Sequence, residues 1–378
     1  MTPNMMQSEA GRLRKLYAEA EEKIIAYMAE QLKSGANDYG WGEKKLAEIR
    51  AVNAEFARRV AELRKKSKSE TDALIEDAYD AGASHYRSDL GAPGERILTV
   101  TPESRNNATL RLIRETDEKF DAQASAILRD VEDAYRSIIG EVLQMQSVGV
   151  TTTQQSIQSA LNEFAERGIV SFVDRAGRKW EMDSYAEMAV RSGMMNAAVT
   201  GYIDDALANG ERLVIVSDHV DECPLCAKWE RAVLALNDDA RNDPGCSGYT
   251  LEEAIAEGLF HPNCEHSVTA YIHGLTRTDF SKSAFGRTRA EDAAGYAATQ
   301  KQRKMERNLR KWKRRQAAAI TPEDERLAAA YVTRWRSALE SFTDENNLKR
   351  KRWREGKNVK LSEAALKLPV VRLKPLNY

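Results

Sequence analysis

Residues 11–27, with the sequence GRLRKLYAEAEEKIIAY, carry apolar side chains at three- and four-residue steps: Leu13, Leu16, Tyr17, Ala20, Ile24 and Tyr27. This spacing places them on one face of an α-helix. Similar stretches continue to about residue 148, with breaks at 34–42 and 91–94 where Gly, Pro, Asn and Asp gather. The pattern predicts a helical scaffold without catalytic features, with helices over 8–33, 41–66, 69–88 and 103–147.

The composition agrees with a mainly helical chain of more than one structural unit. Its 378 residues favour two or three units, and the hydrophobic fraction of 42% with only 9 Pro favours long amphipathic helices. Because 57 Lys and Arg oppose 58 Asp and Glu, we do not expect the whole surface to bind nucleic acid. No apolar run is long enough to span a bilayer, and no signal peptide is recognisable, so a soluble protein made in the cytosol is expected.

The central region combines short strands with a helix. Two runs of β-branched and aromatic residues within 169–182 flank a polar turn at 174–177 and predict a β-hairpin. Ser184 and Glu187 have the spacing of a capping box, and a helical apolar stripe follows to about residue 209. The apolar run at 213–216 then predicts a buried strand that leads into a cysteine-rich segment.

All 4 cysteines lie in that segment, which favours metal binding over a disulfide framework. The strings Cys-Pro-Leu-Cys and His-Pro-Asn-Cys each let one tight turn present two ligands. Together they supply a complete tetrahedral set for a structural zinc ion, formed by Cys223, Cys226, His261 and Cys264. Four protein ligands leave no open position for a substrate, so we expect the ion to stabilise the fold.

Several alternatives to this ligand set remain open on the sequence. His266 can replace His261, and Cys246 can also reach the site. The cysteines can instead be small buried hydrophobic residues without a metal, because free cysteine is often buried. Asp218 and His219 next to a zinc-type motif also raise the alternative of an HNH-like metal-finger nuclease, although His219 precedes both ligand pairs, whereas the catalytic His of such nucleases lies between them.

The C-terminal part is predicted to form a basic helical hairpin. Residues 301–315 have an apolar stripe and a cluster of cations that predicts a polyanion-binding face, made of Lys301, Arg303, Lys304, Arg307, Arg310, Lys311, Lys313, Arg314 and Arg315. Thr321 and Pro322 predict the start of a second helix. The competing interpretation is a solvated helix face whose apolar stripe lies in the core of the hairpin, and no base-reading motif accompanies the cations.

The central strings resemble the phage minor capsid protein 2 family, which is related in this region to the MuF-like head morphogenesis proteins of tailed phages. The resemblance covers about residues 10–345, and its most diagnostic part is Gly258-Leu-Phe-His-Pro-Asn-Cys-Glu-His266. Further matching strings are FVDR at 172–175, SYAEM at 184–188, VIVSDH at 214–219 and CPLC at 223–226. Glu265 departs from the family, in which Arg is usual.

The resemblance implies a non-enzymatic, low-copy component of the virion head, synthesised in the host bacterial cytoplasm, near the portal and active in head assembly or in DNA packaging or ejection. Its implied partners are portal and capsid proteins, with non-specific DNA contact, no membrane and no small-molecule substrate. A zinc-containing DNA-binding module outside the virion is an alternative. The expected fold is mainly α with a small α+β region. Its expected domains are a helical N-terminal region (1–148), a MuF-like α+β domain with a zinc-type knuckle (149–280), a basic helical hairpin (281–347) and a basic, flexible tail (348–378).

Overall fold

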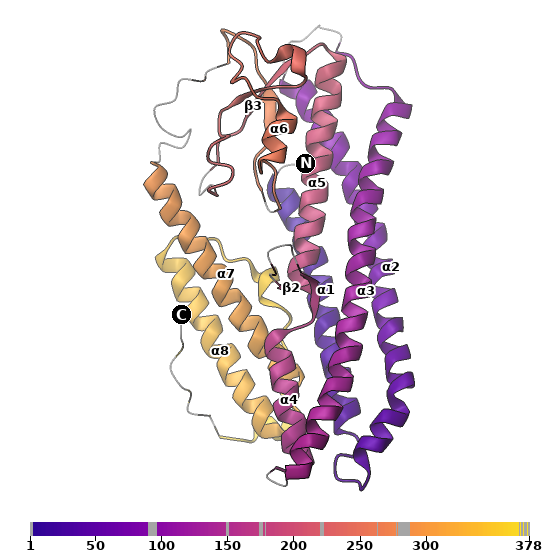
Figure 1. Cartoon of the computed structure of the whole chain (residues 1–378). Coiled ribbons are helices and arrows are strands. Elements are labelled where there is room, and N and C mark those ends of the chain that lie inside the picture. Colours follow the sequence, from indigo (N-terminus) through magenta and orange to yellow (C-terminus); the bar gives the residue numbers. More distant parts are fainter. Residues whose placement is uncertain are drawn as a thin grey trace. The chain divides into compact units, whose positions relative to one another are not determined.

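The computed structural model describes most of the chain. The described residues are 3–89, 97–148, 151–173, 177, 179–219, 223–262, 264–276, 278, 288–369, 371, 373 and 376. The helices within them are α1 (Pro3–Lys33), α2 (Trp41–Asp89), α3 (Pro102–Val148), α4 (Thr153–Arg167), α5 (Met182–Ala208), α6 (Leu251–Ala256), α7 (Arg289–Ala317), α8 (Pro322–Glu345) and α9 (Glu363–Leu366) (Figure 1). The strands are β1 (Val170–Val173), β2 (Lys179–Glu181), β3 (Leu213–Val216), β4 (Val233–Ala235) and β5 (Val268–Ala270), and two short 3₁₀ turns lie at Asp238–Ala240 and Arg352–Glu355. The prediction of a mainly α fold with a small α+β region is confirmed.

The N-terminal helices differ from the prediction in two respects, the first being that α1 begins at Pro3 and not at residue 8. The predicted helices over 41–66 and 69–88 form one continuous helix, α2. The intervening residues contain neither Gly nor Pro, and Ser67 is fully buried with its hydroxyl donating to the carbonyl oxygen of Arg64. The predicted break at 34–42 is confirmed as a turn, whereas the one at 91–94 lies outside the described residues.

The chain divides into two compact units, and their boundaries fall inside helices. Unit 1 contains 1–10, 68–119 and 188–299, and unit 2 contains 11–67, 120–187 and 300–378. Each unit therefore combines segments that are far apart in the sequence. Among the described residues, no helix is both long and apolar enough to cross a membrane.

The N-terminal helical scaffold of unit 2 is held by aromatic residues. The rings of Tyr17 and Phe120 lie 5.9 Å apart, and the ring of Phe56 lies 5.7 Å from Tyr27 and 6.1 Å from Tyr135. These contacts join α1, α2 and α3, and most of the five side chains are fully buried. The hydrophobic periodicity of the N-terminal sequence thus produces one shared core.

The predicted hairpin is also part of unit 2. Strands β1 and β2 are antiparallel, with Phe172 opposite Trp180 and Val173 opposite Lys179. The buried side chain of Gln123 in α3 donates to the carbonyl oxygen of Met182 at 2.7 Å and so ties the hairpin to the helices. Of the predicted turn at 174–177, only Gly177 is among the described residues.

The C-terminal helices of unit 2 form the predicted hairpin. Helices α7 and α8 lie side by side (Figure 1), and Met305 and Leu309 of α7 pack against Val332, Trp335 and Leu339 of α8. The ring planes of Trp312 and Tyr331 stack with their centroids 3.9 Å apart. Thr321 caps α8 as predicted, since its side chain accepts a hydrogen bond from the backbone N–H of Asp324.

Unit 1 combines segments of α2, α3 and α5 with a three-stranded antiparallel sheet of order β4-β3-β5. Strand β3 is buried along its entire length, as its continuous apolar sequence predicts. The backbone N–H of Ala270 in β5 donates to the hydroxyl of Tyr202 at 2.7 Å, which attaches the sheet to α5. Thr250 forms a capping box with Glu253 at the start of α6, as the sequence also predicts.

Candidate metal centre and basic helix

The sheet of unit 1 brings the two predicted ligand turns to one edge. Strands β3 and β5 are antiparallel neighbours with Val216 opposite Val268, so the end of β3 and the start of β5 lie at the same edge. The backbone N–H of Ser217 donates to the carbonyl oxygen of Ser267 at 2.9 Å just beyond them. The Cys-Pro-Leu-Cys turn follows β3 and the His-Pro-Asn-Cys turn precedes β5, so the strand pairing brings the two turns together.

Each turn places one ligand against a ligand of the other. The Sγ of Cys223 lies 2.8 Å from Nε2 of His261, and the Sγ of Cys226 lies 3.5 Å from the Sγ of Cys264. Ligands on a tetrahedral zinc ion are separated by about 3.5–3.8 Å, given zinc–sulfur and zinc–nitrogen distances of about 2.3 and 2.1 Å. The ligand atoms of Cys223, Cys226 and His261 all lie within 4.8 Å of one another. These residues can therefore hold a metal ion after small movements of the side chains.

The structure brings His266 to the same site. The ligand atoms of Cys226, Cys264 and His266 form a second group within 4.8 Å, with Nδ1 of His266 lying 3.4 Å from the Sγ of Cys264. Each histidine has one nitrogen held by a partner outside the thiol groups: Nδ1 of His261 contacts the carbonyl oxygen of Pro262 at 2.8 Å, and Nε2 of His266 contacts Glu230 at 2.9 Å. Metal-ligating histidines commonly have such a partner, so both remain chemically suitable.

Cys246 is placed elsewhere. Its side chain packs against the hydrophobic cluster on the sheet, which includes Leu213, Val233 and Tyr271. Its sulfur accepts a hydrogen bond from the backbone N–H of Gly248 at 3.4 Å. Among the described cysteines and histidines, it belongs to neither ligand group.

Hydrogen bonds in the centre favour the ionised form of one thiol. The hydrogen bond from Cys226 lowers the pKa of the Cys264 thiol to about 4 against the opposing effect of burial, and raises the pKa of Cys226. Burial acts to lower the pKa of His266, but its hydrogen bonds to Cys264 and Glu230 raise it to about 9. The ionised thiol of Cys264 is thus paired with the cationic form of His266, and thiolate is the form in which cysteine binds metals.

The residues that suggested a nuclease have other contacts. Nε2 of His219 lies 3.0 Å from one carboxylate oxygen of Glu265, and Arg191 forms an ion pair with the other at 3.2 Å. The backbone N–H of His219 donates to Glu230. Glu265, the departure from the family pattern, thus connects His219 to α5 within unit 1.

The basic helix α7 is partly buried, which corrects the predicted polyanion-binding face. Arg310, Lys313 and Arg314 are between 2% and 3% exposed, so they cannot contact DNA phosphates in this fold. Lys311 pairs with Glu166, and the guanidinium of Arg315 lies over the ring of Trp312. The predicted residues with exposed side chains are Lys301, Lys304 and Arg307, and Arg303 is half-buried.

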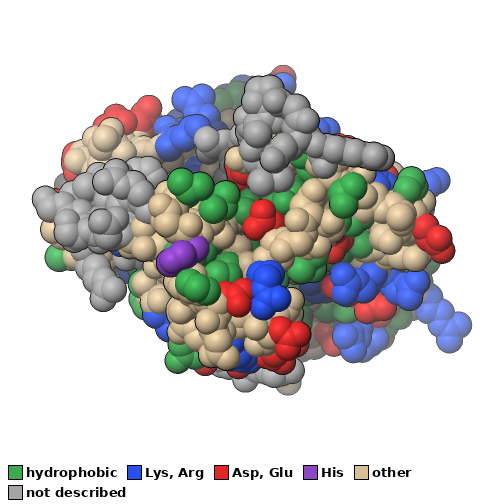
Figure 2. Space-filling model, turned by 90° about the horizontal axis from the view of Figure 1, so that it is seen from above, with side chains coloured by type: hydrophobic (Ala, Val, Ile, Leu, Met, Phe, Trp, Pro, Cys, Tyr) green, Lys and Arg blue, Asp and Glu red, His purple; other side chains and the backbone are tan. Residues whose placement is uncertain are grey.

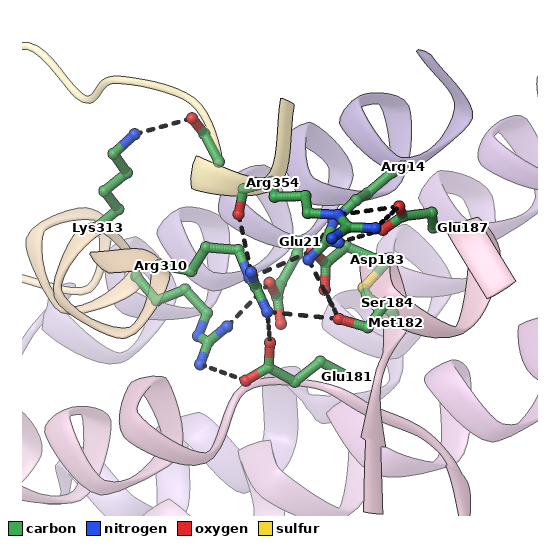
Figure 3. Close-up of polar contacts among 12 residues, drawn as sticks. Arg14, Glu21, Glu181, Met182, Asp183, Ser184, Glu187, Arg310, Lys313 and Arg354 are labelled. Atoms are coloured by element: carbon green, nitrogen blue, oxygen red, sulfur yellow. Dashed lines mark hydrogen bonds and ion pairs between the residues drawn. The ribbon is translucent and has the colours of Figure 1, made fainter. Parts of the chain in front are cut away.

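The buried cations belong to a cluster of charges in unit 2 that the sequence analysis missed (Figure 3). Arg310 reaches Glu181 at 2.8 Å and Asp183 at 3.2 Å, and Arg314 reaches Glu181 at 3.1 Å and Glu21 at 3.5 Å. Burial alone would raise the pKa of Glu181, but Arg314 and Arg310 lower it. Burial raises the pKa of Glu21 to about 7 against the attraction of Arg314.

The predicted capping box at Ser184 and Glu187 is wrong, because α5 begins at Met182. Glu187 instead binds Arg354 at 2.6 Å and also Arg14, and the hydroxyl of Ser184 lies 3.3 Å from Arg14. Acidic and hydroxyl side chains at three-residue spacing occur both in caps and in buried ion clusters. The four-residue steps between Glu306, Arg310 and Arg314 were the available signal for a second, polar buried face of α7.

Charges of both signs are interspersed on the described part of the surface in Figure 2. Groups of Lys and Arg side chains lie there beside Asp and Glu side chains. This agrees with the formal net charge of -1 for the whole chain. Contact with a polyanion would therefore depend on local groups of cations.

Comparison with known proteins supports the resemblance drawn from the sequence. The model of the family described as phage minor capsid protein 2 matches residues 1–344. A protein of Lactococcus phage LL-H, described as "Structural protein", is 21% identical over 302 residues, covering 74% of this chain and 78% of the relative. No solved structure matches the chain. Since the family model includes the two ligand turns and most of both compact units, the chain belongs to the phage minor capsid protein 2 family.

Proposed function

We propose that the protein is a non-enzymatic structural component of a tailed-phage head, located near the portal and active in head assembly or in DNA packaging or ejection. The observation that carries this proposal is the family match over residues 1–344. The description of the Lactococcus phage relative as a structural protein supports it. The helical scaffold and its extensive buried contacts also support a structural role.

The proposal is tested on purified virions of the phage that encodes the chain. Quantitative mass spectrometry should find the protein at low copy relative to the major capsid protein, and chemical cross-linking should join it to the portal protein. Absence from virions, with abundance in infected-cell cytosol, would contradict the proposal. A plasmid-nicking assay with Mg²⁺ tests the absence of enzymatic activity, and cleavage that is lost in His219→Ala would favour the nuclease alternative.

We propose further that the metal centre holds one structural zinc ion through Cys223, Cys226, Cys264 and Nε2 of His261. The two turns then contribute two ligands each, and His266 remains bound to Glu230. Zinc prefers such sulfur and nitrogen donors, and a closed set of four suits a structural site. The ion would clamp the segment between β3 and β5, where the exposed side chains of Leu225, Tyr249 and Ile255 indicate a small core.

Elemental analysis of protein never exposed to chelator should find about one zinc per chain. Cys226→Ser should open the segment to limited proteolysis between about residues 223 and 262, while most helical circular dichroism persists. Cys246→Ser is the matched control, because Cys246 lies outside both ligand groups. Retained protection in Cys226→Ser would mean that the cysteines are ordinary buried residues. Loss of zinc in His266→Ala but not in His261→Ala would reassign the fourth ligand.

We also propose that the protein makes non-specific contact with packaged DNA through the exposed cations Lys301, Lys304 and Arg307. Each phosphate contact that is removed should reduce the slope of log affinity against log salt by about one. Lys304→Gln should therefore weaken binding to duplexes of any sequence. Arg315→Gln is the comparison, because its side chain lies over Trp312. An unchanged salt slope in Lys304→Gln would contradict this contact.

A further inference from the structure

The segment at residues 349–362, here called the arm, lies along α7. Four of its backbone carbonyl oxygens accept hydrogen bonds from side chains of α7. The donor–acceptor pairs are Gln302 to Lys349 at 3.2 Å, Arg310 to Arg354 at 2.8 Å, Lys313 to Gly356 at 2.8 Å and Gln316 to Val359 at 3.1 Å. The donors recur at helical spacing and so share one face of α7. The donors along this face of α7 and the carbonyl oxygens along the arm follow one another in the same sequence order.

One side chain of the arm enters the buried charge cluster. Arg354 is 4% exposed, and its Nε and Nη2 lie 3.0 and 2.6 Å from the same carboxylate oxygen of Glu187 (Figure 3). The neighbouring ring of Trp353 lies against α1, where a methyl group added at Gly11 would be only 2.8 Å from it. The backbone N–H of Lys357 donates to Glu22 at 3.0 Å.

The arm contributes a cation to the charge balance of the cluster. The carboxylates of the cluster are those of the buried Glu21, Asp183, Glu187 and Glu306 and of the partly buried Glu181, and four of them pair with the guanidinium groups of Arg14, Arg310 and Arg314. Arg354 supplies a fourth guanidinium beside Glu187. A buried charge that loses its partner is strongly unfavourable. A cation is therefore favoured at position 354, and the several N–H donors of arginine are well placed to bind a carboxylate.

The arm is also built to act as a unit. It contains its own ion pair, between Arg350 and Glu355 at 2.6 Å, around the short turn Arg352–Glu355. It follows the exposed end of α8, where Asn347 has a positive φ of 52°. The family model ends at residue 344, before the arm begins. Main-chain hydrogen bonds combined with one buried side chain are the usual means of binding an extended peptide.

We infer that the polar face of α7, together with Glu187, is a docking surface for the arm of a second copy of this chain. The chain's own arm occupies this surface in the structure. The same segment from the second copy can replace it. The contacts are the same whether the arm comes from its own chain or from another. The surface can thus join copies of the protein without any new interface.

The test uses the full chain with a protease site inserted after Asn347. After cleavage the C-terminal fragment should stay bound, and a labelled peptide of residues 349–362 in excess should exchange for it. In Arg354→Met the fragment should dissociate at least about 10-fold faster, because one partner of a buried charge pair is lost. Arg352→Met, with an exposed side chain in the same turn, is the matched control and should behave as wild type.

Two further results decide the inference. An Arg354→Met version of the labelled peptide should fail to exchange. Gly11→Ala should also accelerate dissociation, because it displaces Trp353 without changing any charge, and it keeps the test valid if Arg354→Met fails to fold. Equal dissociation from Arg354→Met and Arg352→Met, or exchange of the Arg354→Met peptide as fast as the native one, would overturn the inference.

Discussion

Gly201→Ala should destabilise unit 1, although alanine is the better helix former. A methyl group added at Gly201 of α5 would lie 2.1 Å from the carbonyl oxygen of Tyr79 in α2. Helices α2 and α5 also approach closely at Gly82 of α2, where an added methyl group would lie 1.9 Å from the carbonyl oxygen of Ala198 in α5. Both obstacles are backbone atoms of helices, which no change of rotamer can move away.

The magnitude follows from the separation that the new methyl group requires. Ordinary contact begins at about 3.4 Å, so α2 and α5 must separate by about 1.3 Å at Gly201. Overpacking in a rigid core typically costs about 1–3 kcal/mol, and a backbone obstacle places this substitution at the upper end of that range. The higher helix propensity of alanine offsets about 1 kcal/mol of this loss in the free energy of unfolding. We expect a net loss of about 2 kcal/mol in the free energy of unfolding.

Urea unfolding followed by far-UV circular dichroism measures this loss. Gly140→Ala in α3 is the matched control, because a methyl group there meets no atom within 4 Å. It should stabilise the protein by about 1 kcal/mol. Faster hydrogen exchange in the α5 residues after Met188 should accompany Gly201→Ala alone. If Gly201→Ala stabilised the protein as much as Gly140→Ala, the close helix crossing would be refuted.

Three other predictions concern charges and a helix cap. Burial raises the pKa values of Glu21 and Glu22 to about 7, so the folded chain binds more protons than the unfolded one above about pH 4.5, and the free energy of unfolding should fall as pH rises from about 5 to 8. If Glu21→Gln showed the same slope of unfolding free energy against pH as the wild type, this prediction would be contradicted. Arg314→Met should cost about 3–5 kcal/mol in urea unfolding, because it removes the cation beside the buried Glu21 and one of the two cations that pair with Glu181, whereas Arg315→Met should change little. Thr250→Ala should cost about 1 kcal/mol by removing the cap of α6, and undiminished protection of that helix from hydrogen exchange would show that the cap contributes nothing.

Local patterns in the sequence determined the secondary structure and the ligand turns. The steps between apolar residues predicted the long helices, and Thr250 and Thr321 form the caps that their residue types favour. The repeated form of the two cysteine turns was enough to predict that they meet. Such features depend on neighbours within a few residues, which is the range over which helical periodicity and capping act.

The tertiary structure decided which faces of those helices are buried and against what. The sequence could not show that Arg310 and Arg314 point into a cluster with Glu181, because their partners come from segments more than a hundred residues away. The sequence also could not show the partner of Glu187. Its spacing from Ser184 suggested a helix cap, but in the folded chain Glu187 pairs with Arg354. Periodicity places a side chain on a face of its helix, but only packing determines whether that face meets water or an opposite charge.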